Sequence, residues 1–137
     1  MLDAIPVFLC CNFRKTGKWA NELPMPYLTR GTAYGTMWDL RDYAAVYFKP
    51  TTEVVHGEVY MLTRRQLRSV EGLLDVIQKH GRKRYGSFMR QRVAVTVPDG
   101  TQMVAFGYKY IQHTESRLHD GGVPRITSGD WRKHRGR

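Results

Sequence analysis

A β-hairpin signal in the second half of the chain constrains the fold most. Residues 92–97 (RVAVTV) place three valines on one face of a predicted strand. Residues 98–101 (PDGT) form a turn signal, and the alternating run QMVAFGYKYI follows at residues 102–111. Two alternating segments joined by Pro-Asp-Gly are typical of paired antiparallel strands. The sequence therefore predicts an antiparallel hairpin over residues 92–111.

Further strands and one helix precede this hairpin. The strand patterns cover residues 4–9, 32–40 and 52–62. A helix is predicted at residues 64–79, because Thr63 and Gln66 have the spacing of a capping box and Gly81 ends the pattern. Its apolar stripe consists of Leu67, Val70, Leu73, Leu74 and Ile77. Strands, one helix and strands again predict an α+β fold: a small, mostly antiparallel β-barrel with a helix packed at its end.

Length and charge limit the classes of protein that the chain can belong to. The 137 residues, with a hydrophobic fraction of 42%, indicate one folded domain. We place this domain at residues 1–131, followed by a basic C-terminal tail at residues 132–137. The net charge of +10 predicts a surface that attracts anions. No apolar run approaches the ~20 residues that a membrane helix needs, so no membrane partner is expected.

The cysteines and histidines indicate neither a disulfide nor a metal site. Cys10 and Cys11 are adjacent, and neighbours on a strand point to opposite faces. We therefore expect two reduced thiols and a cytoplasmic location. The five histidines have no ligand spacing, so no metal and no cofactor are expected. Residues 115–122 (ESRLHDGG) are interpreted as a surface loop.

Six short motifs occur in a set order along the chain. They are VFLCCNFRKTG (7–17), GTAYGTMWDLRDYAAVYFKP (31–50), VVHGEVYML (54–62), LLDVIQKHG (73–81), FMRQRVAV (88–95) and ITSGDW (126–131). In this order they resemble the gamma-glutamylcyclotransferase-like family, which includes the gamma-glutamylamine cyclotransferases. The resemblance implies a small β-barrel with flanking helices. It also implies a cavity at the barrel mouth, lined by the first loop and by the helix.

The resemblance implies a reaction as well. Active members of that family release 5-oxoproline from gamma-glutamyl compounds. A glutamate on the helix removes a proton from the substrate's α-ammonium, and the amine then attacks the γ-carbonyl. Backbone N–H groups of the first loop bind the substrate's carboxylate.

The chain departs from the family pattern within this pocket. Gln78 aligns with the glutamate, and an amide cannot accept the proton. Cys10 and Cys11 replace the loop's tyrosine and glycine, and Phe88 replaces a tyrosine. Asn12, Arg14, Asp75 and Arg90 keep the pattern. The predicted site therefore consists of Gln78 at the general-base position and of the ligand-binding residues Cys10, Cys11, Asn12, Phe13, Arg14, Phe88 and Arg90.

These departures predict a ligand-binding protein on a cyclotransferase-like scaffold, without cyclotransferase activity. Its expected ligand is a small anionic metabolite, for example a nucleotide. One alternative is an active gamma-glutamyl(amine) cyclotransferase whose base has moved to Glu71, Asp75 or Glu58. A second alternative is a basic nucleic-acid-binding protein that uses residues 79–92 and 132–137. The sequence carries no signal for an oligomeric state.

Overall fold

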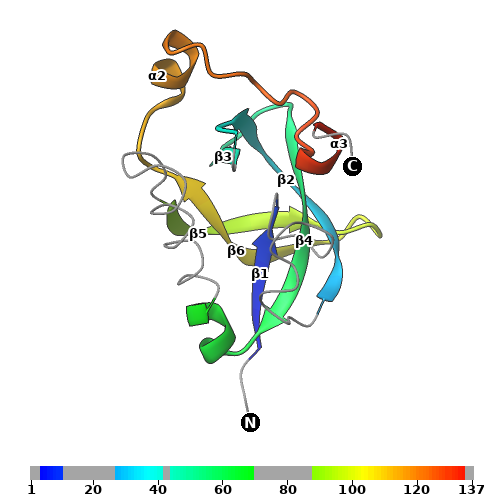
Figure 1. The fold of residues 1–137 in the computed structure, drawn as a ribbon. Helices are drawn as coiled ribbons and strands as arrows, with labels where there is room; N and C mark the ends of the chain where they lie inside the picture. Colours follow the sequence, from blue (N-terminus) through cyan, green and yellow to red (C-terminus); the bar gives the residue numbers. More distant parts are fainter. Residues whose placement is uncertain (1–3, 11–26, 42–43, 70–87, 135–137) are drawn as a thin grey trace.

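The computed structural model describes residues 4–10, 27–41, 44–69 and 88–134. This part contains six strands, two short helices and a further helical stretch at residues 64–69 (Figure 1). The strands are β1 (Ile5–Leu9), β2 (Tyr27–Asp39), β3 (Ala44–Phe48), β4 (Val54–Leu62), β5 (Phe88–Thr96) and β6 (Gln102–Tyr110). The short helices are α2 (Glu115–Asp120) and α3 (Trp131–His134).

Five of the strands close into a barrel. The strand order is β3-β2-β4-β1-β6-β5, and β2 also pairs with β5 where Thr32 lies opposite Thr96. This last pairing closes β2, β4, β1, β6 and β5 into a ring and leaves β3 attached to β2. Only the pairing of β1 with β6, at Val7 and Phe106, is parallel among the described strands. The predicted α+β fold with a mostly antiparallel barrel is confirmed.

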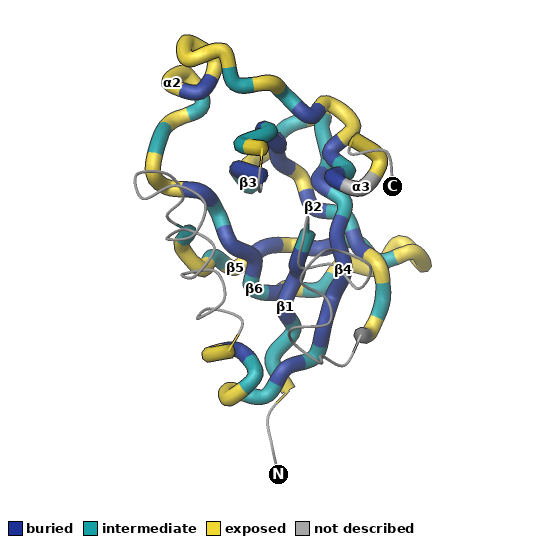
Figure 2. Tube along the Cα trace, viewed as in Figure 1, coloured by how far each residue is buried: buried dark blue, intermediate teal, exposed yellow. Residues whose placement is uncertain are grey.

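The barrel strands contribute to two hydrophobic clusters, and β5 and β6 leave part of their outer faces exposed (Figure 2). The interior cluster takes side chains from all six strands, among them Phe8, Met37, Val46, Val59, Val95 and Ala105. The outer cluster includes Leu9, Tyr60 and Tyr108. It also includes Leu67 from the helical stretch and Leu118 from α2, so these two segments cover part of the outer face of the barrel.

The predicted hairpin and helix start are confirmed in detail. Strands β5 and β6 pair over their whole lengths, from Phe88 opposite Tyr110 to Thr96 opposite Gln102. At the helix start, the Thr63 N–H donates to Gln66 Oε1 at 2.8 Å, and the Gln66 N–H donates to Thr63 Oγ1 at 3.2 Å. This reciprocal pair is the predicted capping box.

Two features differ from the sequence interpretation. Residues 115–120 form helix α2 and not a loop. Thr114 caps this helix by accepting from the Arg117 N–H, and Leu118 is buried beneath it. Strand β3 was not predicted, and β2 begins at Tyr27, five residues before the predicted strand.

The C-terminal segment adds backbone hydrogen bonds to the edges of β2 and β4. Asp39 N–H donates to the carbonyl of Pro124, and Ile126 N–H donates to the carbonyl of Met37, both at 2.8 Å. Helix α3 then carries the chain to His134, whose Nε2 lies 2.9 Å from Asp39 Oδ2. The boundary that we placed after residue 131 therefore falls inside α3.

Candidate functional site: the end of strand β1 and its polar surroundings

The end of β1 lies beside a buried carboxylate. Leu9, the last residue of β1, is opposite Glu58 in the antiparallel ladder with β4. The Glu58 residue is only 4% exposed, and its Oε1 accepts a hydrogen bond from the Tyr60 hydroxyl at 2.7 Å. Cys10 follows directly and is partly buried against the interior cluster. Cys10, the first of the predicted ligand-binding residues, therefore follows the residue that is opposite Glu58 on β4.

Several aromatic rings belong to the outer cluster that also contains Tyr60. Phe88 and Tyr110 are opposite each other on β5 and β6, with ring centroids 5.9 Å apart in an edge-to-face arrangement. Tyr110 also packs edge-on against Tyr47 of β3, at 6.1 Å. Phe88 therefore serves as an apolar wall of an aromatic cluster, and it lacks the hydroxyl that the family pattern has at this position.

Arg90 lies on the outer face of the hairpin. It is opposite Tyr108 in the ladder, and its guanidinium carbon is 4.9 Å from the centre of the Phe106 ring. This distance is typical of a cation–π contact, which holds the side chain along β6. The structure therefore places Phe88 and Arg90 two residues apart on the same strand face.

The remaining predicted site residues lie outside the described part of the chain. They are Gln78, Cys11, Asn12, Phe13 and Arg14. The geometry of the general-base position and of the first loop is therefore a prediction from the sequence. Of the predicted site, the structure places Cys10, Phe88 and Arg90.

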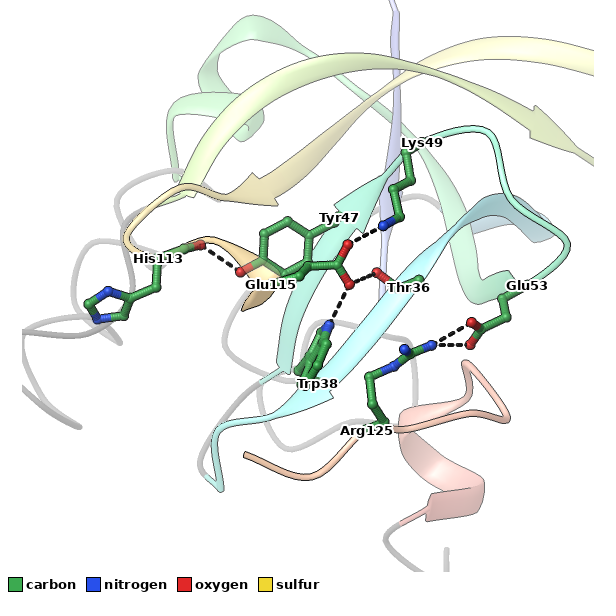
Figure 3. Close-up of polar contacts among 8 residues, drawn as sticks. All are labelled: Thr36, Trp38, Tyr47, Lys49, Glu53, His113, Glu115 and Arg125. Carbon is green, nitrogen blue, oxygen red and sulfur yellow. Dashed lines mark hydrogen bonds and ion pairs between the residues drawn. The ribbon is translucent and has the colours of Figure 1, made fainter. Parts of the chain in front are cut away.

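A second carboxylate, Glu115, joins α2 to strand β2 (Figure 3). Its Oε2 accepts from the Thr36 hydroxyl at 2.6 Å and from the Trp38 indole N–H at 2.7 Å. Its Oε1 accepts from the Lys49 ammonium. Burial alone would raise the pKa of Glu115, but the hydrogen bonds from Lys49, Thr36 and Trp38 outweigh it and hold this pKa below its ordinary value. A carboxylate with three donors is a structural link and a poor proton acceptor.

The Trp38 indole is held from two sides. Glu115 accepts its N–H, and the guanidinium carbon of Arg125 lies 5.1 Å from the ring centre. Arg125 in turn pairs with Glu53 through one guanidinium nitrogen, Nη2, which lies 2.5 Å from both carboxylate oxygens (Figure 3). This link fastens the C-terminal segment to the turn before β4.

Tyr47 completes the polar surroundings. Its hydroxyl donates to the carbonyl of His113 at 2.7 Å (Figure 3). Burial raises the pKa of Tyr47 strongly, and the nearby Tyr110 and Glu115 raise it further. The phenol therefore stays protonated and acts as a donor.

Sequence reasoning missed the Glu115 and Arg125 links altogether. The partners in these links are 66 to 79 positions apart in the chain. No local spacing pattern marks such pairs, because the barrel topology alone brings them together. Glu58 was considered only as one alternative base, and the Gly-Glu-Val-Tyr motif was the signal that contained it.

The described residues contain neither a cluster of three metal-ligating side chains nor a helix long and apolar enough to cross a membrane. Glu58 is a buried carboxylate with a tyrosine donor, and Cys10 is a partly buried thiol. Cys10 packs against the interior cluster, whereas Tyr60 and Phe88 belong to the outer cluster.

The class of this protein is a five-stranded, mostly antiparallel barrel with a buried carboxylate on β4 opposite the last residue of β1. A family model described as "Gamma-glutamyl cyclotransferase, AIG2-like" matches residues 9–133. The chain therefore belongs to this family, and the resemblance read from the six motifs is confirmed. A comparison with curated proteins finds no match.

Solved structures share the fold at low sequence identity. The AIG2-like protein from Mus musculus superposes with a TM-score of 0.70 at 15% identity, covering 93% of this chain and 89% of that one. A uropathogenic E. coli-specific protein gives 0.66 at 12% identity, with 98% of both chains covered. YkqA from Bacillus subtilis gives 0.70 at 18% identity and covers 96% of this chain, but this chain spans only 41% of YkqA. At these identities the likeness shows the fold alone.

Proposed function

We propose that the chain is a ligand-binding member of the gamma-glutamyl cyclotransferase, AIG2-like family that does not catalyse the cyclotransferase reaction. The observation that carries this proposal is Gln78, which the resemblance places at the family's general-base position and which lies inside the range matched by the family model. A neutral amide cannot take the proton from an α-ammonium. A pocket with glutamine at this position can bind a ligand but lacks the group that would start the reaction.

The proposed ligand is a small anionic metabolite, for example a nucleotide. A glutamate at position 78 would repel an anion. At an effective dielectric constant near 20, the repulsion between two like charges ~4 Å apart is about 4 kcal/mol. Glutamine removes this repulsion and adds an amide donor. The net charge of +10 also favours the approach of anions.

Restoring the base tests the first half of the proposal. The protein as it exists should release no 5-oxoproline from gamma-glutamyl amino acids or amines, and Gln78→Glu should create this activity. Gln66→Glu is the matched control, because it makes the same change within the predicted helix at residues 64–79, and glutamate fits a capping box as well as glutamine does. Release of 5-oxoproline by the unmodified protein would contradict the proposal.

Thermal unfolding tests the second half. Nucleotides or phosphorylated metabolites should raise the midpoint of unfolding at constant ionic strength, because a ligand that binds only the folded state stabilises it. Potassium chloride at the same ionic strength and a short double-stranded DNA are the controls. No rise with any anionic metabolite, or a rise with DNA alone, would contradict binding of a small anion.

One observation favours a second candidate, an active enzyme with a relocated base. Glu58 is a buried carboxylate beside the end of β1, where the first loop begins. If Glu58 were the base, Glu58→Gln would abolish 5-oxoproline release while Gln78→Glu changed it little. A circular dichroism melt of the Glu58→Gln protein separates a catalytic loss from a loss of folding.

A further inference from the structure

A cavity lies on the barrel wall, and the described residues of the predicted family site, Cys10, Phe88 and Arg90, are not among those that line it. Its volume is about 250 Å³. The outer faces of β2 and β4, the end of β5 and the C-terminal segment form its walls. The lining residues are Arg30, Gly31, Thr32, His56, Gly57, Thr96, Val97, Pro98 and Asp130. This volume is slightly below the range of typical ligand pockets and fits a molecule of a few heavy atoms.

The strand register brings the polar side chains of this cavity together. Thr32 is opposite His56 on β4 and opposite Thr96 on β5, at the pairing that closes the barrel. Side chains that are directly opposite in an antiparallel pair lie about 5 Å apart on one face. Arg30, two residues before Thr32, lies on that same face of β2. Three strands thus contribute polar groups to one patch about 7 Å along β2.

The floor of the cavity is rigid. Gly31 and Gly57 are opposite each other in the ladder. A Cβ at Gly31 would lie 2.5 Å from Val95 Cγ1, and a Cβ at Gly57 would lie 2.6 Å from the carbonyl oxygen of Leu9. Atoms of the barrel interior therefore fill the space below both glycines. The two backbone segments cannot move inward, and neither position can take a larger residue.

Opposite charges line the walls of the cavity. Arg30 supplies a guanidinium from β2, and Asp130 supplies a carboxylate from the C-terminal segment. Within the described part of the chain, no hydrogen bond or ion pair occupies the Arg30 guanidinium or the His56 imidazole. Asp130 Oδ1 accepts the Lys133 N–H at 3.3 Å and so fixes the carboxylate at the start of α3.

The balance of charge selects the kind of ligand. One guanidinium and one carboxylate line the cavity, from Arg30 and Asp130. A pair of opposite charges on two walls suits a ligand that carries one charge of each sign. We propose that this cavity binds a small zwitterion of the free amino-acid type. Its carboxylate bonds to Arg30 and the Thr32 and Thr96 hydroxyls, and its ammonium faces Asp130.

This inference goes beyond the proposed function and rests on other residues. An NMR titration of the full chain with glycine, L-alanine and L-glutamine tests it. The Gly31 and Gly57 amides should shift saturably, with a dissociation constant below about 1 mM. L-Alaninamide and N-acetyl-L-alanine, which each keep one of the two charges, should bind at least about tenfold more weakly. No saturable shift up to about 20 mM, equal binding of either derivative, or tighter binding of inorganic phosphate would overturn the proposal.

Three variants test whether the amino acid binds in this cavity. Arg30→Met and Asp130→Asn should each weaken amino-acid binding about tenfold or more. Asparagine caps a helix as well as aspartate does, so the second variant removes the charge and keeps the start of α3. Arg117→Met, on the exposed surface of α2, is the charge-matched control and should leave binding unchanged. Equal binding by all three variants would overturn the assignment. Gln78→Glu should not change this binding, so failure here is distinguishable from failure of the proposed function.

Discussion

Gly129, in the Ser-Gly-Asp-Trp motif, shows how one residue secures the C-terminal segment. Its φ is +65°, in the left-handed region that favours glycine. A Cβ at this position would lie 1.8 Å from the carbonyl oxygen of Val54. The Gly129 carbonyl accepts the His56 N–H at 2.8 Å, so the close approach also provides a backbone hydrogen bond to β4.

Gly129→Ala should therefore lower the free energy of unfolding by about 3 kcal/mol or more, because backbone strain and a backbone clash act together. Gly122→Ala is the control. Its φ is +74°, but no atom lies within 4 Å of the added Cβ, so only the strain of about 1–2 kcal/mol applies. Urea unfolding of both variants measures the difference. Equal losses would show that the clash is relieved by movement of the segment.

At the residue scale, the chemical groups of a site were easier to predict from the sequence than the residues that pack around them. The Gly-Glu-Val-Tyr motif contains Glu58 and its hydrogen-bond partner Tyr60, two residues apart on one strand, but the burial of Glu58 depends on the strands on either side of β4. Phe88 was recognised as a lost hydroxyl, whereas its edge-on contact with Tyr110 requires the register of the hairpin. The identity of a residue is read directly from the sequence, whereas its burial depends on strands that are distant along the chain.

At the scale of elements, the Glu115 link should make the attachment of α2 depend on pH. The pKa of Glu115 is held below its ordinary value of 4.5, so the carboxylate is charged more readily in the folded chain than in the unfolded chain. The stability from this group is fully present above pH 4.5 and is lost as the pH falls through the lower folded pKa.

Glu115→Gln should lower the free energy of unfolding at neutral pH by about 1–3 kcal/mol, since charge-assisted hydrogen bonds become neutral ones. The variant should also lose less stability than the parent between neutral pH and acid. Denaturant unfolding at a series of pH values measures both effects. Asp120→Asn, on the exposed end of the same helix, is the control for charge. Parallel pH curves for Glu115→Gln and the parent would contradict the assigned role.

Elements that depend on local signals were predicted well, and the others were not. The capping box and the Pro-Asp-Gly turn lie within a few residues of the structure they start, and both are confirmed. Helix α2 has only six residues, and its first residue is held by partners on β2 and after β3. Strand β3 is five residues long and depends on pairing with β2. Periodicity over so few residues does not separate helix, strand and loop.

For the whole molecule, the interior cluster should carry most of the stability. Val95 is fully buried between strands, and Val104, on the partner strand, is 61% exposed. Val95→Ala removes two buried methyl groups and should lower the free energy of unfolding by about 2 kcal/mol. Val104→Ala makes the same change at the surface and should cost less than about 0.5 kcal/mol. Chemical denaturation of the two variants gives the comparison, and similar losses would contradict a packed barrel interior.

The closed barrel itself could be predicted only as a class. Alternating strands around one helix indicated an antiparallel α+β fold, and the family motifs indicated a barrel. Closure depends on Thr32 of β2 meeting Thr96 of β5, and the sequence contains no mark of that pairing. The cavity at this junction was missed for the same reason, because its walls come from four separate parts of the chain.

The C-terminal segment has a consequence for how the chain reaches its native state during synthesis. Residues 124–131 supply the backbone hydrogen-bond partners of Met37, Asp39 and His56. Within this segment, Ile126 and Trp131 are buried. The ribosome makes all six strands before it makes these residues. A nascent chain can thus pair its strands early, yet two of them remain without their last bonds until translation has passed Trp131.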